Sequence, residues 1–187
     1  MKLLKNHHYT IVDVSDIEKV STLSVNDMGI ALVQSQETFL PDDIGDELIL
    51  MLDTINDPGN LGTIIRIADW YGIKHIICNT KTVDFYNPKV IMSTMGSFSR
   101  INFVKTDLEK FLAEYSGNIY GALLDGENIH TAQKTKTGCI IIGNESHGIS
   151  NELLPYITQK ITIPRFGGAE SLNAGVATAI ILDNFKK

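Results

Sequence analysis

The sequence predicts an α/β domain whose mainly parallel sheet is flanked by helices on both faces. Short apolar runs alternate with helix-like segments from about residue 47 to residue 187. These runs are apolar almost without interruption, which is typical of strands buried on both faces. Loops rich in glycine and polar residues follow several runs, and open parallel sheets bind ligands beyond the carboxyl ends of their strands. We therefore expect a ligand site in those loops.

The alternation assigns each element in turn. Strands are expected at residues 47–52, 74–79, 101–105, 118–125, 138–144 and 159–164, with two more at 9–14 and 29–36. Helices are expected at residues 15–23, 60–72, 87–98, 106–115, 150–157 and 171–185. In the second of these helices the apolar positions fall on one face, with the spacing i, i+3, i+4 and i+7, at Leu61, Ile64, Ile65 and Ala68.

Residues near the helix starts are of the types that cap helices. Glu18 lies three residues after Ser15, as in a capping box, and Pro88 suits a first helical turn. The predicted caps, in chain order, are Ser15, Asn60, Thr106 or Asp107, Ser150, and Ser171 or Asn173. The inward face predicted for the last helix holds Leu172, Val176, Ala179 and Ile180.

Composition limits the class of protein. The 187 residues are 43% hydrophobic and 20% charged, which suits a soluble globular domain with a sizeable core. No apolar run reaches the roughly 18 residues of a membrane span, and the first ten residues lack a signal core, so we expect a cytoplasmic protein without membrane contact. The net charge of −6 argues against a protein that coats nucleic acid indiscriminately, although it leaves room for a local basic patch.

The cysteines and histidines give no sign of a metal site. Cys78 and Cys139 each lie inside an apolar, strand-like run, which favours buried thiols over a disulfide or a metal pair. The five histidines show none of the spacings typical of ligands, so no metal is expected.

The first loop of interest covers residues 53–66. Helical geometry places Gly62, Arg66 and Asp69 on one polar stripe, where a glycine below an arginine would let a ligand or another chain approach closely. The alternative is that Arg66 and Asp69 form an ordinary surface pair contributing about 0.3 kcal/mol.

The second loop, residues 143–148, places Glu145 at the mouth of a buried strand between two glycines. It could equally be a strand-to-helix turn with a solvated carboxylate. His147 in this loop is not expected to act as a general base, because a lone loop histidine is more often simply exposed.

The third loop, residues 164–173, combines Gly167 and Gly168 with Arg165 and leads into the last helix. The N–H groups at a helix start can bind a carboxylate or phosphate. The alternative is a flexible turn with ordinary capping. The chain has neither an early G-x-G-x-x-G nor a Walker A lysine, which disfavours dinucleotide and nucleoside triphosphate sites.

Together the three loops resemble the SpoU (TrmH-like) family of RNA 2′-O-ribose methyltransferases, in the SPOUT superfamily. The first motif resembles NDPGNLGTIIR at residues 56–66, and the second IGNE at 142–145 with GIS at 148–150. The third resembles IP at residues 163–164 with SLN at 171–173. The likeness covers roughly residues 28–187, and NPKV at 87–90 with Gly96 adds to it.

The resemblance implies a SPOUT-type domain over residues 26–187, with a deep trefoil knot at its C-terminal end. It implies a bent S-adenosylmethionine, converted to S-adenosylhomocysteine, with backbone groups holding this cofactor at Leu123, Gly143, Ile163 and Leu172. It also implies a homodimer formed through the knot region, with each active site completed across the interface. Residues 1–25 would be the remnant or tail of an N-terminal RNA-binding domain, since one strand and one helix cannot close a core.

The reaction implied is transfer of the sulfonium methyl to a ribose 2′-hydroxyl in structured rRNA or tRNA. By this likeness Arg66 lies nearest the reacting hydroxyl, where it would orient the ribose or a phosphate and stabilise the developing alkoxide, since arginine is a poor base. The other catalytic candidates would orient Arg66, cofactor and substrate, and are Asn60, Glu145, Ser171 and Asn173.

The sequence departs from the family pattern at a few positions. Ala174 and Gly175 follow the SLN motif where valine and serine are common, and Met92 replaces a residue that is often polar or basic. Two alternatives stay open: a non-catalytic RNA-binding or assembly module that retains the fold, and a different nucleotide-dependent enzyme on an ordinary α/β sheet.

Overall fold

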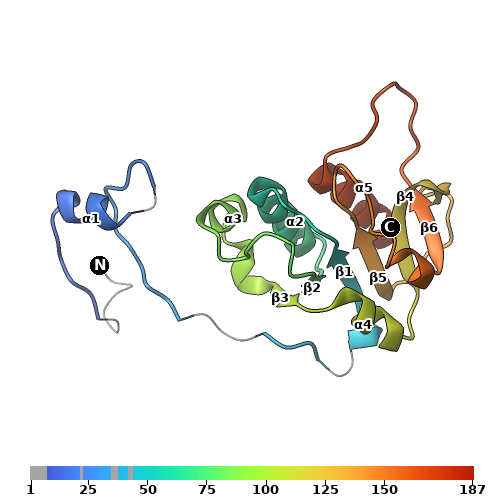
Figure 1. The fold of residues 1–187 in the computed structure, drawn as a ribbon, viewed down its shortest axis with the longest axis horizontal. Helices are drawn as coiled ribbons and strands as arrows, with labels where there is room; N and C mark the ends of the chain where they lie inside the picture. Colours follow the sequence, from blue (N-terminus) through green and yellow to red (C-terminus); the bar gives the residue numbers. More distant parts are fainter. Residues whose placement is uncertain (1–7, 22, 35–37, 42–43) are drawn as a thin grey trace. The chain divides into compact units, whose positions relative to one another are not determined.

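A computed structural model describes residues 8–21, 23–34, 38–41 and 44–187 (Figure 1). The chain forms two compact units, Met1–Glu37 and Thr38–Lys187. The second unit is built on one six-stranded sheet of order β3-β2-β1-β5-β4-β6, in which every paired neighbour is parallel. The strands are β1 Leu48–Leu52, β2 His75–Cys78, β3 Asn102–Lys105, β4 Ile119–Asn128, β5 Gly138–Ile142 and β6 Gln159–Thr162. The predicted fold class is confirmed.

Helices cover both faces of this sheet. Figure 1 shows α3 (Pro88–Ser93), α2 (Pro58–Trp70) and α5 (Ala174–Lys186) side by side on one face. On the other face lies α4 (Leu108–Glu114), whose Leu108 and Leu112 belong to a separate apolar cluster. Three short 3₁₀ segments complete the unit: η2 (Ile44–Asp46), η3 (Ser97–Arg100) and η4 (Leu154–Tyr156).

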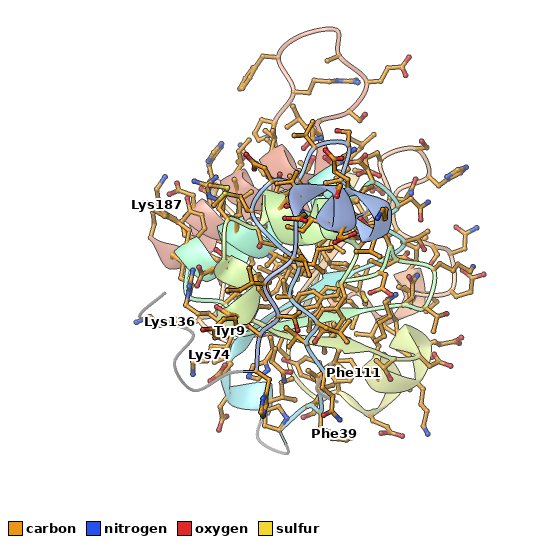
Figure 2. All side chains as sticks on the ribbon, turned by 90° about the vertical axis from the view of Figure 1, so that its left-hand side faces the viewer. Tyr9, Phe39, Lys74, Phe111, Lys136 and Lys187 are labelled. Atoms are coloured by element: carbon orange, nitrogen blue, oxygen red, sulfur yellow. The ribbon has the colours of Figure 1, made fainter. Side chains whose placement is uncertain are left out.

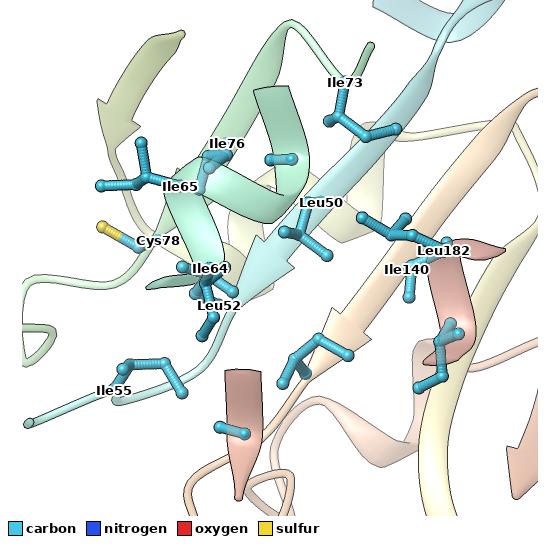
Figure 3. Packing of buried hydrophobic residues seen from close by; sticks show 14 of the residues in the cluster. Leu50, Leu52, Ile55, Ile64, Ile65, Ile73, Ile76, Cys78, Ile140 and Leu182 are labelled. Carbon is cyan, nitrogen blue, oxygen red and sulfur yellow. The ribbon is translucent and has the colours of Figure 1, made fainter. Parts of the chain in front are cut away.

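The strands supply side chains to both apolar layers, which explains why their sequences are continuously apolar. In β1, Leu50 and Leu52 point to the layer under α2 and α5, while Met51 points to the layer under α4. In β5, Ile140 and Ile141 divide in the same way. Figure 3 shows Leu50 of β1 and Ile140 of β5 packed with Ile64 of α2 and Leu182 of α5. Lys74, Lys136 and Lys187, labelled in Figure 2, are exposed on the surface.

The predicted start of α2 needs correction. Its cap is Asp57, whose Oδ1 accepts the backbone N–H of Asn60 at 2.7 Å, and not Asn60 itself. Pro58 takes the first helical position, where its missing N–H costs nothing. The predicted end is confirmed: Gly72 adopts φ +67°, and the N–H of Ile73 donates to the carbonyl of Ala68 at 2.8 Å, as in a Schellman motif.

Within its described residues the first unit shows neither of the two strands predicted for it, and the end of the second, residues 35–36, lies outside the described part of the chain. Residues 8–13 and 25–34 have no helix or strand. Helix α1 (Val14–Val20) overlaps the predicted helix, and its N-cap position is Asp13, not Ser15, although the Asp13 side chain forms no capping hydrogen bond. No residue of α1 is buried, and Ile11, Leu32 and Val33 are largely exposed. Strand-forming side chains do not make a strand without a neighbour to pair with, and the described part of this unit offers none.

Two expectations in the C-terminal part also fail. The helix predicted for residues 150–157 is reduced to η4, and Ser150 does not cap it. In α5 the predicted inward residues Leu172 and Val176 are 46% and 48% exposed. The helix starts at Ala174, capped by Asn173, and turns a different face to the core, formed by Ala174, Gly175, Thr178, Ile181, Leu182 and Phe185. The caps at Asp107 and Asn173, both among the predicted alternatives, are confirmed.

Close helix contacts explain two glycines. A Cβ on Gly62 would stand 2.7 Å from the carbonyl oxygen of Val90 and closer still to the side chain of Ser93, so the space beside Gly62 is filled by α3. The expectation that this glycine admits a ligand or another chain is wrong. A Cβ on Gly175 would lie 2.9 Å from the methyl group of Thr63, so this departure from the family pattern lies where α5 meets α2.

Gly62→Ala should lower the free energy of unfolding by about 1–3 kcal/mol, because overlap with backbone cannot be relieved by a rotamer change. In an open helix the same change would instead stabilise by about 1 kcal/mol. Urea denaturation measures the difference, with Gly168→Ala as control, since nothing lies within 4 Å of a Cβ there. A stable Gly62→Ala variant would contradict this packing.

Candidate functional site

The site is built where β1 and β5 end side by side. These neighbouring parallel strands pair up to Leu52 and Ile142, and the N–H of Asp53 donates to the carbonyl of Ile142 at 2.9 Å. The loops after both strands, residues 53–57 and 143–150, therefore begin next to each other. The first of these loops leads into α2, which brings the N-terminus of that helix to the same edge of the sheet.

A chain of side-chain hydrogen bonds joins three of the predicted catalytic residues. Asn60 Nδ2 donates to Glu145 Oε1 at 2.7 Å, and Asn60 Oδ1 accepts from Asn173 Nδ2 at 2.7 Å. Asn173 Oδ1 in turn caps α5, accepting from the N–H groups of Gly175 and Val176. These bonds span 85 and 113 residues of sequence, so the three motifs meet at Asn60.

Both oxygen and nitrogen of the Asn60 amide are used, so the orientation of this side chain is fixed by its partners. The bond to the Glu145 carboxylate is charge-assisted and therefore stronger than a neutral one. Glu145 is half-buried rather than a solvated turn residue. The alternative interpretation of its loop as an ordinary turn is wrong.

The 143–150 loop is closed by its own backbone. Asn144 and Gly148 exchange N–H···O bonds of 2.9 Å, and Asn144 Oδ1 accepts from the N–H groups of Ser146 and His147. Gly143 has no room for a side chain because Gly148 lies directly against it, and Gly148 adopts φ +70°. These glycines serve the fold of the loop itself. The His147 ring is exposed and contacts only Asn144 Oδ1 among the described hydrogen bonds, which gives it no catalytic partner.

Arg66 extends from the outer face of α2, and no described residue bonds to it or pairs with it. The surface pair with Asp69 considered for it is wrong, because Asp69 is held by Arg100. That guanidinium donates from Nε to Oδ1 at 3.0 Å and from Nη2 to Oδ2 at 2.6 Å. Arg66 therefore keeps all its donors available for a ligand.

The third loop stands apart from this cluster. Figure 1 shows residues 163–173 as an arch that reaches away from the sheet between β6 and α5. Phe166 is 97% exposed, and Ser171 and Leu172 are also exposed. Arg165 Nη1 reaches the carbonyl of Ala169 at 3.4 Å across the arch. Of the site residues predicted in this loop, Asn173 is the one whose side chain forms a described hydrogen bond to another motif, to Asn60 of the first.

Three of the four predicted cofactor-binding residues lie in or directly after the adjacent strands β5, β4 and β6. Gly143 follows β5 directly, and Ile163 follows β6. Leu123 lies in β4 just after Ala122, where the pairing with β6 is interrupted by a shift in register. Leu123 and Ile163 are half-buried, so each presents part of its apolar surface. Apart from exposed Leu172, these positions share one edge of the sheet.

Sequence reasoning missed a buried polar cluster under the same edge. Asp53 is 2% exposed, and with Thr54, Asn79 and Asn144 it forms hydrogen bonds between the ends of β1 and β2 and the 143–150 loop. An aspartate directly after a fully apolar strand was the available signal.

Both cysteines lie in strands of the sheet. Cys78 and Cys139 are buried free thiols, as predicted. Burial raises the pKa of Cys78 to about 12 and raises that of Cys139 as well.

Among the described residues no three His, Cys, Asp or Glu side chains are grouped to hold a metal ion. In the same part of the chain, every helix is too short or too polar to cross a membrane.

Polar loops gathered at the carboxyl edge of a parallel sheet are the arrangement of α/β proteins that bind a ligand there. Comparison with known proteins narrows this class. Residues 47–183 match the model of the SpoU rRNA Methylase family. The chain belongs to this family.

Named relatives agree with this assignment. The chain is 35% identical over 138 residues to the 23S rRNA (guanosine(2553)-2′-O)-methyltransferase RlmP of Bacillus subtilis, covering 72% of this chain and 56% of that protein. It is 29% identical to the tRNA (guanosine(18)-2′-O)-methyltransferase of Thermus thermophilus, covering 73% of this chain and 72% of that one. The chain thus spans little more than half the length of the Bacillus relative.

Solved structures show the same fold. An AdoMet-bound rRNA methyltransferase from Sinorhizobium meliloti matches with a TM-score of 0.70 and 34% identity, over 74% of this chain and 55% of that one. The SpoU methyltransferase AviRb from Streptomyces viridochromogenes, in complex with AdoMet, matches with a TM-score of 0.67 and 31% identity, over 78% of this chain and 62% of that one.

The hydrogen bonds of Asn60 should couple the three motifs energetically. Asn60→Ala should lower the free energy of unfolding by about 1–3 kcal/mol, because Glu145 loses its donor and Asn173 its acceptor. When Asn60 is already alanine, Asn173→Ala should lower the free energy of unfolding less than it does in the wild-type protein, by a difference of at least about 0.5 kcal/mol. Urea denaturation of the double-mutant cycle measures this, with Asn118→Ala in place of Asn173→Ala as an additive control. Additivity of Asn60 and Asn173 would show that the bond contributes nothing.

The Asp69–Arg100 pair predicts a pH dependence of stability. Its bonds to Arg100, and then to Ser97, lower the pKa of Asp69 below its ordinary 3.8. A carboxyl whose pKa is lower in the folded state stabilises fully above its unfolded value, and this contribution is lost as pH falls through the folded value. Arg100→Gln should therefore flatten the decline of unfolding midpoint below about pH 4. Lys160→Gln, which removes a more exposed pair with Asp125, should leave the decline nearly unchanged.

Proposed function

We propose that this chain is the catalytic part of an S-adenosylmethionine-dependent RNA 2′-O-ribose methyltransferase acting on rRNA or tRNA. The observation that carries the proposal is the contact of Asn60 with both Glu145 and Asn173, which joins one residue from each family motif. A binding module would have no need to keep this contact together with an unpaired Arg66. The names of the relatives support the same activity.

The residues present fit S-adenosylmethionine. Leu123 and Ile163 offer partly exposed apolar surface at the strand ends, and Leu172 does so from the arch. Gly143 lies at the same edge, where its backbone groups would serve the cofactor, because Gly148 fills the space beside its Cα. This combination suits an adenosine held by backbone polar groups between apolar side chains. We propose these four residues as the cofactor site and infer that the chain here forms the deep knot of the family.

S-adenosylmethionine supplies an electrophilic methyl group on a sulfonium, so the protein must chiefly align the ribose oxygen and stabilise its developing charge. Arg66 donates to the 2′-oxygen or to an adjacent phosphate and stabilises negative charge there. A guanidinium with a pKa above about 12 does not remove the proton itself. The bonds of Asn60 hold the 143–150 loop against the start of α5, so that Ser171 and Asn173 border the cofactor and the ribose.

Methylation of unmodified rRNA and tRNA with labelled cofactor should yield alkali-resistant 2′-O-methyl nucleotides. Arg66→Ala should lower kcat about 100-fold or more while the Kd for S-adenosylhomocysteine, measured by calorimetry, stays within about twofold. Arg66→Lys keeps the charge but loses the fork of donors, so it should recover only part of the rate.

Methyl groups found only on bases would refute the ribose assignment. Equal loss of rate and cofactor affinity in Arg66→Ala would refute the role given to Arg66. Tight RNA binding without cofactor binding would instead favour a non-catalytic module.

We infer further that the protein acts as a homodimer through its knot region, with Arg66 serving the cofactor site of the partner subunit. The outer surface of the helical layer supports this inference. Trp70, one helical turn beyond Arg66, is 84% exposed, and Leu172 and Val176 of the α5 start are about half exposed. Apolar side chains of this size on one layer are typical of a surface that another chain covers.

Mixing inactive variants tests the shared site. Arg66→Ala and Asn173→Ala chains, each inactive alone, should regain about a quarter of wild-type activity when mixed, because half the dimers would carry one intact site of two. Association should also shift the emission of Trp70, the single tryptophan, to shorter wavelength on concentration. Mixtures that stay inactive while dimers form would place each site within one subunit.

The domain assignment made from the sequence stays a prediction. We propose residues 1–25 as the remnant or tail of an N-terminal RNA-binding domain, and the largely exposed Ile11 in this segment supports the proposal.

A further inference from the structure

We propose that Asp53 is a positioning residue of the methyl-transfer site, which fixes the 143–150 loop so that Glu145 can hold Asn60. The proposal rests on the function proposed above. Asp53 is the residue directly after β1, and its side chain is 2% exposed. No salt bridge reaches it from the described residues, so its negative charge is balanced only by hydrogen bonds.

Two hydrogen bonds clamp the loop at both ends of the segment that carries Glu145. Asp53 Oδ2 accepts the backbone N–H of Ser150 at 2.7 Å. The backbone carbonyl of the next residue, Thr54, accepts a hydrogen bond from Asn144 Nδ2 at 2.8 Å. Because Asn144 precedes Glu145 and Ser150 follows it, the pair of bonds sets the position of Glu145 relative to β1.

The turn that offers these two acceptors is strained. Thr54 has φ +63°, a left-handed backbone conformation that a β-branched residue rarely adopts. Such residues persist only where the surroundings hold them, and they cluster at functional sites. Here Asn79, just after β2, holds the turn: its Nδ2 donates to Asp53 Oδ1 at 2.9 Å and to Thr54 Oγ1 at 2.7 Å.

The hydrogen-bond pattern requires a carboxylate at position 53. Asp53 Oδ2 accepts the backbone N–H of Ser150. Asp53 Oδ1 accepts from Asn79 Nδ2 and, at 3.1 Å, from the hydroxyl of Thr54, so both carboxylate oxygens act only as acceptors. An asparagine would present an NH₂ to one of these donors, and a buried donor would lose its partner. Burying an unpaired carboxylate is costly, which makes a purely space-filling role a poor explanation for Asp53.

The consequence is a connected path from the sheet to the last helix. Asp53 and Thr54 accept hydrogen bonds that fix the 143–150 loop. Glu145 of this loop accepts from Asn60, and Asn60 accepts from Asn173 at the start of α5. Asp53 touches neither Arg66 nor the predicted cofactor-binding residues in these contacts. It acts on them through the loop.

Asp53→Asn tests the proposal, with Asp107→Asn as matched control because Asp107 also accepts a backbone N–H, at the α4 start. In Asp53→Asn, amide hydrogen exchange within residues 143–150 should accelerate at least tenfold. The side-chain NH₂ signals of Asn60, assigned through Asn60→Ala, should shift in the ¹⁵N spectrum. With cofactor saturating, kcat should fall about tenfold or more while the KM for RNA changes less than twofold. None of these should change in Asp107→Asn.

Asn144→Ala opens the second clamp and should give the same three changes, which keeps the test available if Asp53→Asn fails to fold. Unshifted Asn60 signals in a folded Asp53→Asn protein, with only a lower unfolding midpoint, would overturn the proposal and leave Asp53 a structural residue. Shifted signals and faster exchange in a protein whose wild type methylates no RNA would refute the proposed function alone, because neither measurement depends on turnover.

Discussion

The double use of Asn60 is the interaction on which the site depends. One amide group donates to a carboxylate after β5 and accepts from the cap of α5, so three segments distant in sequence are held at one point. This is possible because β1 and β5 are parallel neighbours and α5 packs against α2. The sheet order and the contact between α2 and α5 bring the three segments together, and the hydrogen bonds of Asn60 depend on both.

Much of the second unit follows from simple patterns. Runs such as 48–52 are apolar at every position because both faces of the sheet are covered, and this is visible in the sequence. Helix ends marked by proline or glycine, as at Pro58 and Gly72, were also predictable in outline. The three motifs gave Asn60, Glu145 and Asn173 as candidate site residues, but only the resemblance to a family placed the three in one site.

The failures have common physical causes. Asn60 was expected to cap α2, whereas Asp57 does so and frees the Asn60 side chain for two distant partners. Gly62 was expected to make room for a ligand, yet the room is taken by α3, whose position depends on contacts that no local pattern reports. The inward face of α5 was misjudged for a similar reason, because Gly175 sets how closely α5 meets α2. Local sequence patterns do not show which distant segment will pack against a given residue.

The distance along the chain between Asn60 and its two partners bears on how the protein is made. The carboxylate lies 85 residues later and the second amide 113 residues later. A nascent chain that has been synthesised only as far as β5 still lacks Asn173, which donates to the Asn60 oxygen in the complete chain. Contacts of such long separation close slowly, after local structure has formed. The hydrogen bond between Asn60 and Asn173 can therefore form only after the start of α5 has been synthesised.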